Sequence, residues 1–284
     1  MPCFDLAPAA PLAPACRSIF SRLACLALLM VSALLAGCAS MSEPAESGSA
    51  PSVRRITPWD QASVSSVSSP ALDASAASRW QHHTFPGKAA NQFAYLQLDG
   101  RSALGVKSRG AASMLRKTVS VEPEQLGMLR FSWKVPALIP DADMGQRDKS
   151  DSPVRLVLAF EGDRSRLSPR DHMLSELARA LTGEEMPYAT LMYVWCNQRE
   201  PGSVQLNSRT DRIRKLVLES GPTRLNRWID YERDVRADFI RAFGEPPGRL
   251  IAIGIMTDTD NTRSSAQAWY GPVMLSRADP PKVP

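Results

Sequence analysis

The sequence predicts a mainly β fold, an antiparallel β-sandwich or jelly roll with one or two short helices packed on it. In residues 129–135 the odd positions are apolar and the even ones polar, the period of a strand with one wet face. Near-continuous apolar runs at 154–160, 190–195 and 250–256 predict central strands covered on both faces. Turns rich in Gly, Pro and Asp separate about ten short segments, a spacing typical of a sandwich or jelly roll.

Residues 1–37 are expected to be a lipoprotein signal peptide and not part of the fold. Arg17 and Arg22 precede a short apolar stretch that ends in Leu-Ala-Gly before Cys38. The stretch is too short to cross a hydrocarbon layer about 30 Å thick as a helix, so it is typical of a cleaved signal. We expect lipid on the Cys38 thiol to anchor the chain to the cell envelope; the alternative is an ordinary cleaved signal. Ala39 after the cysteine favours the periplasmic face of the outer membrane.

The rest of the chain divides by composition into a linker, one domain and a tail. Residues 38–78 are rich in Ser, Ala and Pro and are expected to be a disordered linker. Residues 79–278 are expected to form a single sandwich domain, and 279–284 a disordered tail. The formal net charge is only +5 and no run is dense in Lys and Arg, so we expect no nucleic-acid partner.

The mature chain is expected to contain no internal disulfide. Three of the five cysteines leave with the signal peptide and Cys38 is lipidated, so only Cys196 remains. Cys196 lies in an apolar run, which favours a buried, inert thiol over a catalytic one.

Two segments have helical patterns. Ser168, Pro169 and Asp171 form a start resembling a capping box, and Gly183 can end the helix. The apolar residues between them recur at helical spacing, which predicts a helix with its apolar face down on the sandwich. A second, shorter helix is expected near 235–243, before Gly244.

Asp258, Asp260 and Asn261 follow the apolar run at 250–256 and are the sharpest polar feature of the domain. Acids and amides in a short loop can supply several of the oxygens that calcium prefers, so a structural calcium ion is one interpretation. The stretch lacks the glycine and the distal glutamate of a full calcium loop. The two alternatives are a strand-end cap, in which these side chains bond their own backbone, and a catalytic role. No other cofactor is expected.

A second set of candidates is expected to bind a ligand. Arg155 interrupts an apolar strand and must find partners if buried, either a fixed acid such as Asp258 or Asp260 or a ligand in a groove. Asp151 lies in the loop before that strand. Tyr193 and Trp195 are two residues apart and so share a strand face, which could form a flat surface for a sugar ring. The alternative for both aromatic residues is a place in the core.

Four stretches together resemble a known bacterial family. They are 109–113, 149–155, 191–195 and 254–262, and their order and spacing are similar to those of domain of unknown function 3047. The resemblance covers about residues 54–278 and implies a secreted or periplasmic β-sandwich, similar in outline to carbohydrate-binding jelly rolls, with no established activity. The chain has Asp151-Ser152 where the family tends to carry paired acids, and Pro272 where it tends to carry Asp. Both departures remove a carboxylate.

The expected function is therefore that of a membrane-anchored, non-catalytic module that binds an envelope glycan or a protein partner. No nucleophile elbow, zinc-binding helix motif or phosphate loop occurs in the chain. The alternative is an envelope hydrolase or lyase acting on polysaccharide through carboxylates or a metal, because a glycosidase needs only two acids at the right separation.

Overall fold

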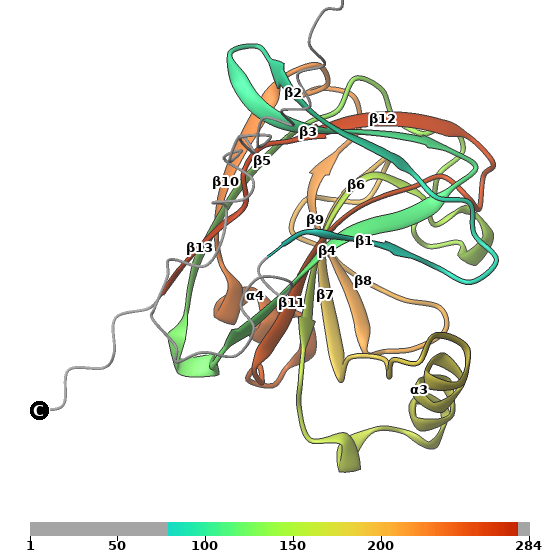
Figure 1. The fold of residues 1–284 in the computed structure, drawn as a ribbon, viewed down its shortest axis with the longest axis vertical. Helices are drawn as coiled ribbons and strands as arrows, with labels where there is room; N and C mark the ends of the chain where they lie inside the picture. Colours follow the sequence, from blue (N-terminus) through green and yellow to red (C-terminus); the bar gives the residue numbers. More distant parts are fainter. Residues whose placement is uncertain (1–78, 278–284) are drawn as a thin grey trace, which may run out of the picture. The chain divides into compact units, whose positions relative to one another are not determined.

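The computed structural model describes residues 79–277, which form two curved β-sheets packed face to face. Figure 1 shows the sheet that contains β12, β3 and β2 curving over the sheet that contains β4, β6 and β7. The mainly β, sandwich-like fold expected from the sequence is confirmed. The expected signal peptide, the expected linker with Cys38 and the expected tail lie outside the described residues.

The larger sheet has seven strands in the order β1-β4-β11-β6-β7-β9-β8. Their bounds are β1 Gln81–Thr84, β4 Ala112–Val121, β11 Leu250–Asp258, β6 Ser152–Phe160, β7 Ala189–Cys196, β9 Ile213–Ser220 and β8 Val204–Leu206.

The second sheet has the order β10-β5-β12-β3-β2, and β13 also pairs with β5. Its strands are β10 Trp228–Asp234, β5 Leu126–Lys134, β12 Ser265–Tyr270, β3 Arg101–Arg109, β2 Gln92–Leu98 and β13 Met274–Arg277. Three short 3₁₀ turns lie in the connections, at Pro123–Gln125, Arg147–Lys149 and Arg164–Arg166.

The three apolar runs of the sequence are the three neighbouring strands β11, β6 and β7 at the centre of the larger sheet. All nine residues of β6 are buried, because each of its faces is covered. Leu156 and Leu158 on one face enter the core between the sheets. Val157 on the opposite face packs with Met256 and Phe85. We call this opposite face of the larger sheet its outer face.

One feature of the larger sheet differs from the antiparallel expectation. Within residues 79–277, β7 and β9 are a parallel pair of strands, with Thr190 opposite Ile213 and Tyr193 opposite Leu216. The connection between them contains β8, which folds back antiparallel onto β9. The local apolar pattern of β9 is the same for either direction, so it could not predict this.

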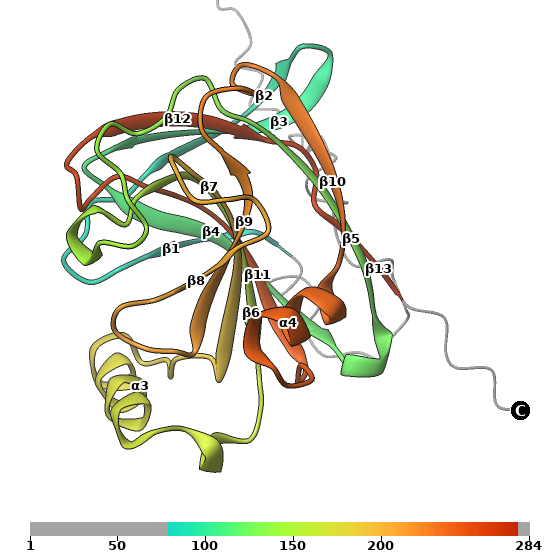
Figure 2. The ribbon, with the colours of Figure 1, turned by 180° about the vertical axis from the view of Figure 1, so that it is seen from behind.

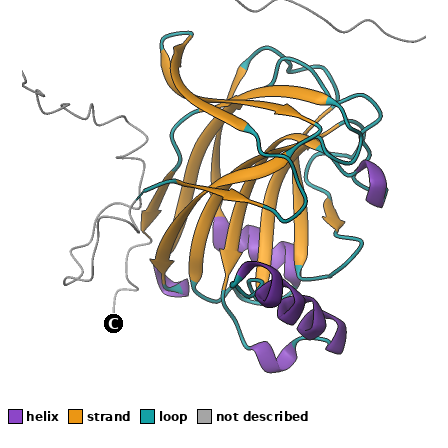
Figure 3. Cartoon of the chain, turned by 45° about the vertical axis from the view of Figure 1, so that its right-hand side comes forward, coloured by secondary structure: helices purple, strands orange, loops and turns teal. Residues whose placement is uncertain are grey.

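Both expected helices are present, as α3 Pro169–Thr182 and α4 Val235–Phe243. The Ser168 hydroxyl caps α3 by accepting from the Asp171 N–H, and Gly183 ends the helix in the left-handed conformation at φ 78°. Figure 2 shows α4 close to β10 and β5, whereas α3 lies out at the edge of the molecule. Both helices lie near the same end of the strands (Figure 3).

The expected packing of α3 is wrong. Asp171 and Ser175 are its buried residues, whereas the apolar stripe is exposed, with Met173 64%, Leu177 53% and Leu181 63% accessible. Polar contacts fix this orientation, because the Asp171 carboxylate accepts from the Thr210 hydroxyl and the Ser175 hydroxyl accepts from Arg164.

Within residues 79–277 no helix is both long and apolar enough to cross a membrane.

Candidate functional site

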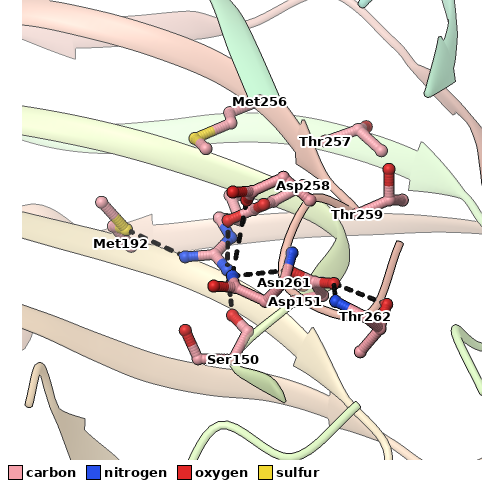
Figure 4. A network of polar contacts seen from close by, with 12 residues as sticks. Ser150, Asp151, Met192, Met256, Thr257, Asp258, Thr259, Asn261 and Thr262 are labelled. Atoms are coloured by element: carbon pink, nitrogen blue, oxygen red, sulfur yellow. Dashed lines mark hydrogen bonds and ion pairs between the residues drawn. The ribbon is translucent and has the colours of Figure 1, made fainter. Parts of the chain in front are cut away.

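The polar candidates of the sequence meet where β6 begins and β11 ends. These strands are antiparallel neighbours, and Asp258 lies opposite Ser152 across the ladder. The loop before β6 and the loop after β11 therefore lie side by side. This places Asp151 next to Asp258, Asp260 and Asn261. Figure 4 shows the side chains of Asp151, Asp258 and Asn261 close together.

Asp151 holds the loop that follows β11. One carboxylate oxygen accepts from the backbone N–H and side-chain amide of Asn261, at 3.2 and 2.8 Å. The other accepts from the backbone N–H and hydroxyl of Thr262, at 2.8 and 2.6 Å (Figure 4). Asp151 is 1% exposed, and both of its oxygens are fully used by this loop. Its role in the site is to position the loop.

Arg155 and Asp258 form a buried ion pair on the outer face of the larger sheet. Their Nη2 and Oδ2 atoms are 2.9 Å apart, and the side chains are only 5% and 9% exposed. Arg155 also donates to the backbone carbonyl of Ser150. Two atoms of the pair, Arg155 Nε and Asp258 Oδ1, are buried without a hydrogen-bond partner. Buried polar atoms are almost always paired, so this donor and this acceptor mark the place as unusual.

Burial raises the pKa of Asp258 to about 6. The positive charge of Arg155 opposes this rise, and the nearby Asp151 carboxylate adds to it. Asp258 therefore changes its protonation state close to neutral pH, unlike an ordinary surface aspartate.

Lys215 is a functional candidate that sequence reasoning missed. It lies on β9 opposite Met192 and is 2% exposed. Burial lowers its pKa to about 7, and the charge of Arg155 lowers it further, against the attraction of Asp258 and Asp151. The available signal was the same as for Arg155, a cation that interrupts a run of apolar strand residues.

Lys88 is a second residue of the site that the sequence does not indicate, because it lies in the turn after β1, far from β11 in the sequence. Its ammonium group forms an ion pair with Asp260. No local pattern around Lys88 indicates this partner, so only the assembled sheet brings the two together.

A cleft of about 340 Å³ lies on the outer face, and its lining includes Arg155, Asp258 and Lys88 but neither Asp151 nor Lys215. Two of its cations, Arg147 and Arg209, are exposed and have no acidic partner among residues 79–277. The lining residues, which we call the cleft, are Phe85, Pro86, Lys88, Ala112, Arg147, Ser150, Arg155, Asn207, Ser208, Arg209, Met256, Asp258, Asp260 and Asn261.

Tyr193 and Trp195 do not belong to this cleft. Both are 0% exposed and lie in the core between the sheets. The Tyr193 hydroxyl donates to Asp238 at 2.8 Å, and the Trp195 indole N–H donates to the carbonyl of Gly221 at 3.0 Å. They share a strand face, as expected, but Arg155 lies on the other face of the sheet. The expected groove made of Tyr193, Trp195 and Arg155 is therefore wrong.

The expected acidic cluster exists, with Asp151 as its third carboxylate beside Asp258 and Asp260 and with ligand atoms within 4.8 Å of one another. Asn261 donates to Asp151 through its backbone N–H and its side-chain Nδ2. Calcium prefers six to eight oxygens. In this cluster the Asp151 oxygens accept from the loop and the other two acids are paired with cations, whereas Asp258 Oδ1 has no partner, so calcium binding at the cluster stays a prediction.

Cys196 is 4% exposed, which confirms the expected buried thiol. Its sulfur accepts from the Arg199 backbone N–H, and it faces Met144 and Val217 on the outer face of the sheet. It is not among the residues that line the cleft.

Comparison with a family model gives a match over residues 78–274, to the family described as "Protein of unknown function (DUF3047)". No curated protein matches the chain.

Among solved structures, the chain is similar to the family 11 carbohydrate-binding module of a cellulosomal cellulase of Clostridium thermocellum, at 8% identity and a TM-score of 0.35, covering 70% of this chain and 88% of that one. It is also similar to the xyloglucanase domain of NopAA from Sinorhizobium fredii, at 8% identity and a TM-score of 0.38, covering 70% of this chain and 93% of that one. An endoglucanase Cel12A from Rhodothermus marinus is similar at 11% identity and a TM-score of 0.39, covering 70% of this chain and 96% of that one. At these TM-scores the likenesses carry no argument about function.

Proposed function

The chain belongs to the DUF3047 family, and we propose that it is a non-catalytic module that binds an acidic saccharide of the cell envelope in the cleft. The observation that carries the proposal is the pair of exposed guanidinium groups of Arg147 and Arg209, which line the cleft and have no acidic partner among the described residues. Asn207, Ser208 and Ser150 line the same cleft, and their polar side chains can exchange hydrogen bonds with the hydroxyl groups in which saccharides are rich.

The charges around the cleft favour an acidic ligand over a neutral one. Asp258 and Asp260 are already neutralised by Arg155 and Lys88. The guanidinium groups of Arg147 and Arg209 are left at the mouth, where they can bind a carboxylate in the two-pronged geometry that arginine favours.

One aromatic side chain of the cleft can support a sugar ring. Phe85 is half-buried and lines the cleft, so we propose that its ring takes the stacking role expected earlier of Tyr193 and Trp195. The platform therefore comes from the segment after β1 and not from β7.

The test is titration of the protein with oligogalacturonate, with a neutral cello-oligosaccharide as the comparison. We expect binding of the acidic oligomer, and a loss of affinity of about tenfold or more in Arg147→Ser/Arg209→Ser, from lost charge-assisted hydrogen bonds. The matched control, Arg170→Ser/Arg227→Ser, removes two exposed arginines outside the cleft and should bind as the wild type does. Equal binding by both double variants would refute the cleft as the site.

Anchoring completes the proposal. Lipid on Cys38 would hold the module at the cell envelope, which is where the proposed ligand, an acidic saccharide of the envelope, is located. This part is supported by the signal-like sequence before Cys38 and is independent of the cleft.

A second candidate function is an envelope hydrolase or lyase, and the titration behaviour of two groups favours it. Asp258, with a pKa near 6, and Lys215, with a pKa near 7, are an acid and a base in one cluster. Turnover of an acidic polysaccharide that disappears in Asp258→Asn/Asp260→Asn would establish this function. Turnover that persists in the double variant would exclude these carboxylates, and no turnover by the wild type supports the binding module.

A further inference from the structure

A second hollow lies on the same outer face, directly beside the cleft. It has a volume of about 290 Å³ and lies between the larger sheet and the end of α3. Its lining, which we call the groove, consists of His83, Phe85, Met114, Arg116, Val157, Ala159, Ala178, Thr182, Glu184, Glu185, Met186, Pro187, Ile251, Ala252 and Gly254.

The alternation of side chains along the strands makes the cleft and the groove parts of one surface. Along β6, Arg155 lines the cleft, and the next residues on the same face, Val157 and Ala159, line the groove. Along β11, Met256 lines the cleft and Gly254 the groove. The outer face of the central strands thus changes from charged to apolar along its length.

Two further contacts join the hollows. Phe85 lines both of them, and Met256, Val157 and Phe85 pack in one cluster. At Gly254 an added Cβ would lie 3.0 Å from Met114 Sδ and 3.3 Å from Val157 Cβ, so a larger residue would crowd the floor of the groove.

The acids and the arginine of the groove are all in ion pairs, and Glu185 lies 3.1 Å from Arg164. Its arginine, Arg116, forms a two-pronged ion pair with Glu184, with N–O distances of 2.5 and 2.8 Å. An occupant of this part of the surface is therefore favoured by its apolar area.

We propose that the cleft and the groove form one amphipathic site, whose ligand is an acidic saccharide that carries an alkyl or acyl chain. The saccharide lies in the cleft and the chain runs along the outer face into the groove, past Phe85. This inference rests on the proposed function and adds the apolar half of the ligand.

The test uses calorimetric titration with methyl β-D-glucuronide, dodecyl β-D-glucuronide and dodecyl β-D-maltoside, the dodecyl compounds below their micelle-forming concentrations. We expect the dodecyl glucuronide to bind at least about tenfold more tightly than the methyl compound, because the chain buries apolar surface. It should also bind at least about tenfold more tightly than the maltoside, which lacks the carboxylate.

Two variants fill the groove from opposite walls, Ala252→Phe on β11 and Ala178→Phe on α3. Ala252 and Ala178 are both half-buried, so a larger side chain can extend into the hollow. A variant with an unchanged melting temperature should lose the gain from the dodecyl chain and keep the affinity for methyl glucuronide. In Arg147→Ser/Arg209→Ser, both glucuronides should weaken.

The outcomes separate the two proposals. Equal affinities for methyl and dodecyl glucuronide would overturn the amphipathic site and leave acidic saccharide binding intact. The same holds for a gain from the chain that survives in both groove-filling variants. No binding of methyl glucuronide or oligogalacturonate, with equal binding of dodecyl glucuronide and dodecyl maltoside, would overturn the proposed function and this inference with it. Self-association that Ala252→Phe abolishes, with no gain from the chain, would assign the groove to a second copy and overturn the lipid-binding assignment.

Discussion

Lys215 has a strongly lowered pKa, and its environment explains why. A lysine that is 2% exposed loses most of its hydration, and Arg155 is a further positive charge nearby. The acids of the cluster compensate only in part, so its pKa falls to about 7. Folding therefore favours the neutral amine at alkaline pH.

The lowered pKa has a measurable consequence for stability. Between about pH 7 and 10.5 the unfolded chain holds the Lys215 proton and the folded one does not, so the free energy of unfolding rises with pH through this window. We expect Lys215→Met to remove a slope of up to about 1.4 kcal/mol per pH unit, measured by urea unfolding from pH 7 to 9. Lys107→Met, at an exposed lysine, is the control and should keep the wild-type slope. A Lys215→Met slope equal to that of the wild type would show that the amine stays charged.

The residue scale also shows what the sequence could predict of the site. Arg155 stood out as a cation in an apolar strand, and its partner is one of the two acids expected, Asp258. The contacts of Lys88 and Lys215 depend on pairing between distant strands, which no local pattern encodes. Tyr193 and Trp195 share one strand face, as the sequence predicts, but this face lies in the core and not on the surface. Strand alternation shows which residues share a face and does not show which face is exposed.

At the scale of elements, α3 shows the same limit. Its start at Ser168 and its end at Gly183 follow from local chemistry, and both are found as predicted. Its periodicity identified an apolar stripe but not what the stripe faces. The buried contacts of Asp171 and Ser175 turn that stripe outward, because a buried carboxylate must keep its hydrogen bonds.

The exposed stripe predicts a mild response to substitution. Met173→Gln/Leu177→Gln/Leu181→Gln should change the free energy of unfolding by less than about 1 kcal/mol, since glutamine has a similar helix propensity and no core contact is lost. Leu158→Ala, in the core strand β6, should cost about 2–5 kcal/mol in the same urea experiment. A triple variant as unstable as Leu158→Ala would mean that the stripe is buried in solution.

At the scale of the whole molecule, the composition and the hydrophobic periodicity of the strands predict the layers of the fold but not the order of the strands in each sheet. The three apolar runs are the central strands, as predicted, because double burial leaves a clear mark in composition. The parallel pairing of β7 and β9 depends on the path of the connection between them, which no residue pattern within either strand indicates.

The proposed anchoring also belongs to the scale of the whole chain. We expect Cys38→Ser to move the protein from the membrane fraction to the soluble fraction on centrifugation, with the melting temperature unchanged, because Cys38 lies well before the described strands. Ala39→Ser is a neighbouring control that should stay with the membrane. Retention of Cys38→Ser in the membrane fraction would show that another part of the chain holds it there.

The place of β11 in the sheet has a consequence for how the chain matures. β11 lies between β4 and β6, yet it is synthesised more than a hundred residues after β4. Until β11 has been synthesised, β4 and β6 each have an edge whose backbone N–H and C=O groups lack their partner strand. Such distant pairing is slow to form and leaves intermediates open to aggregation. The insertion of β11 between β4 and β6 is therefore expected to be a late step of folding, after the rest of the sheet has begun to assemble.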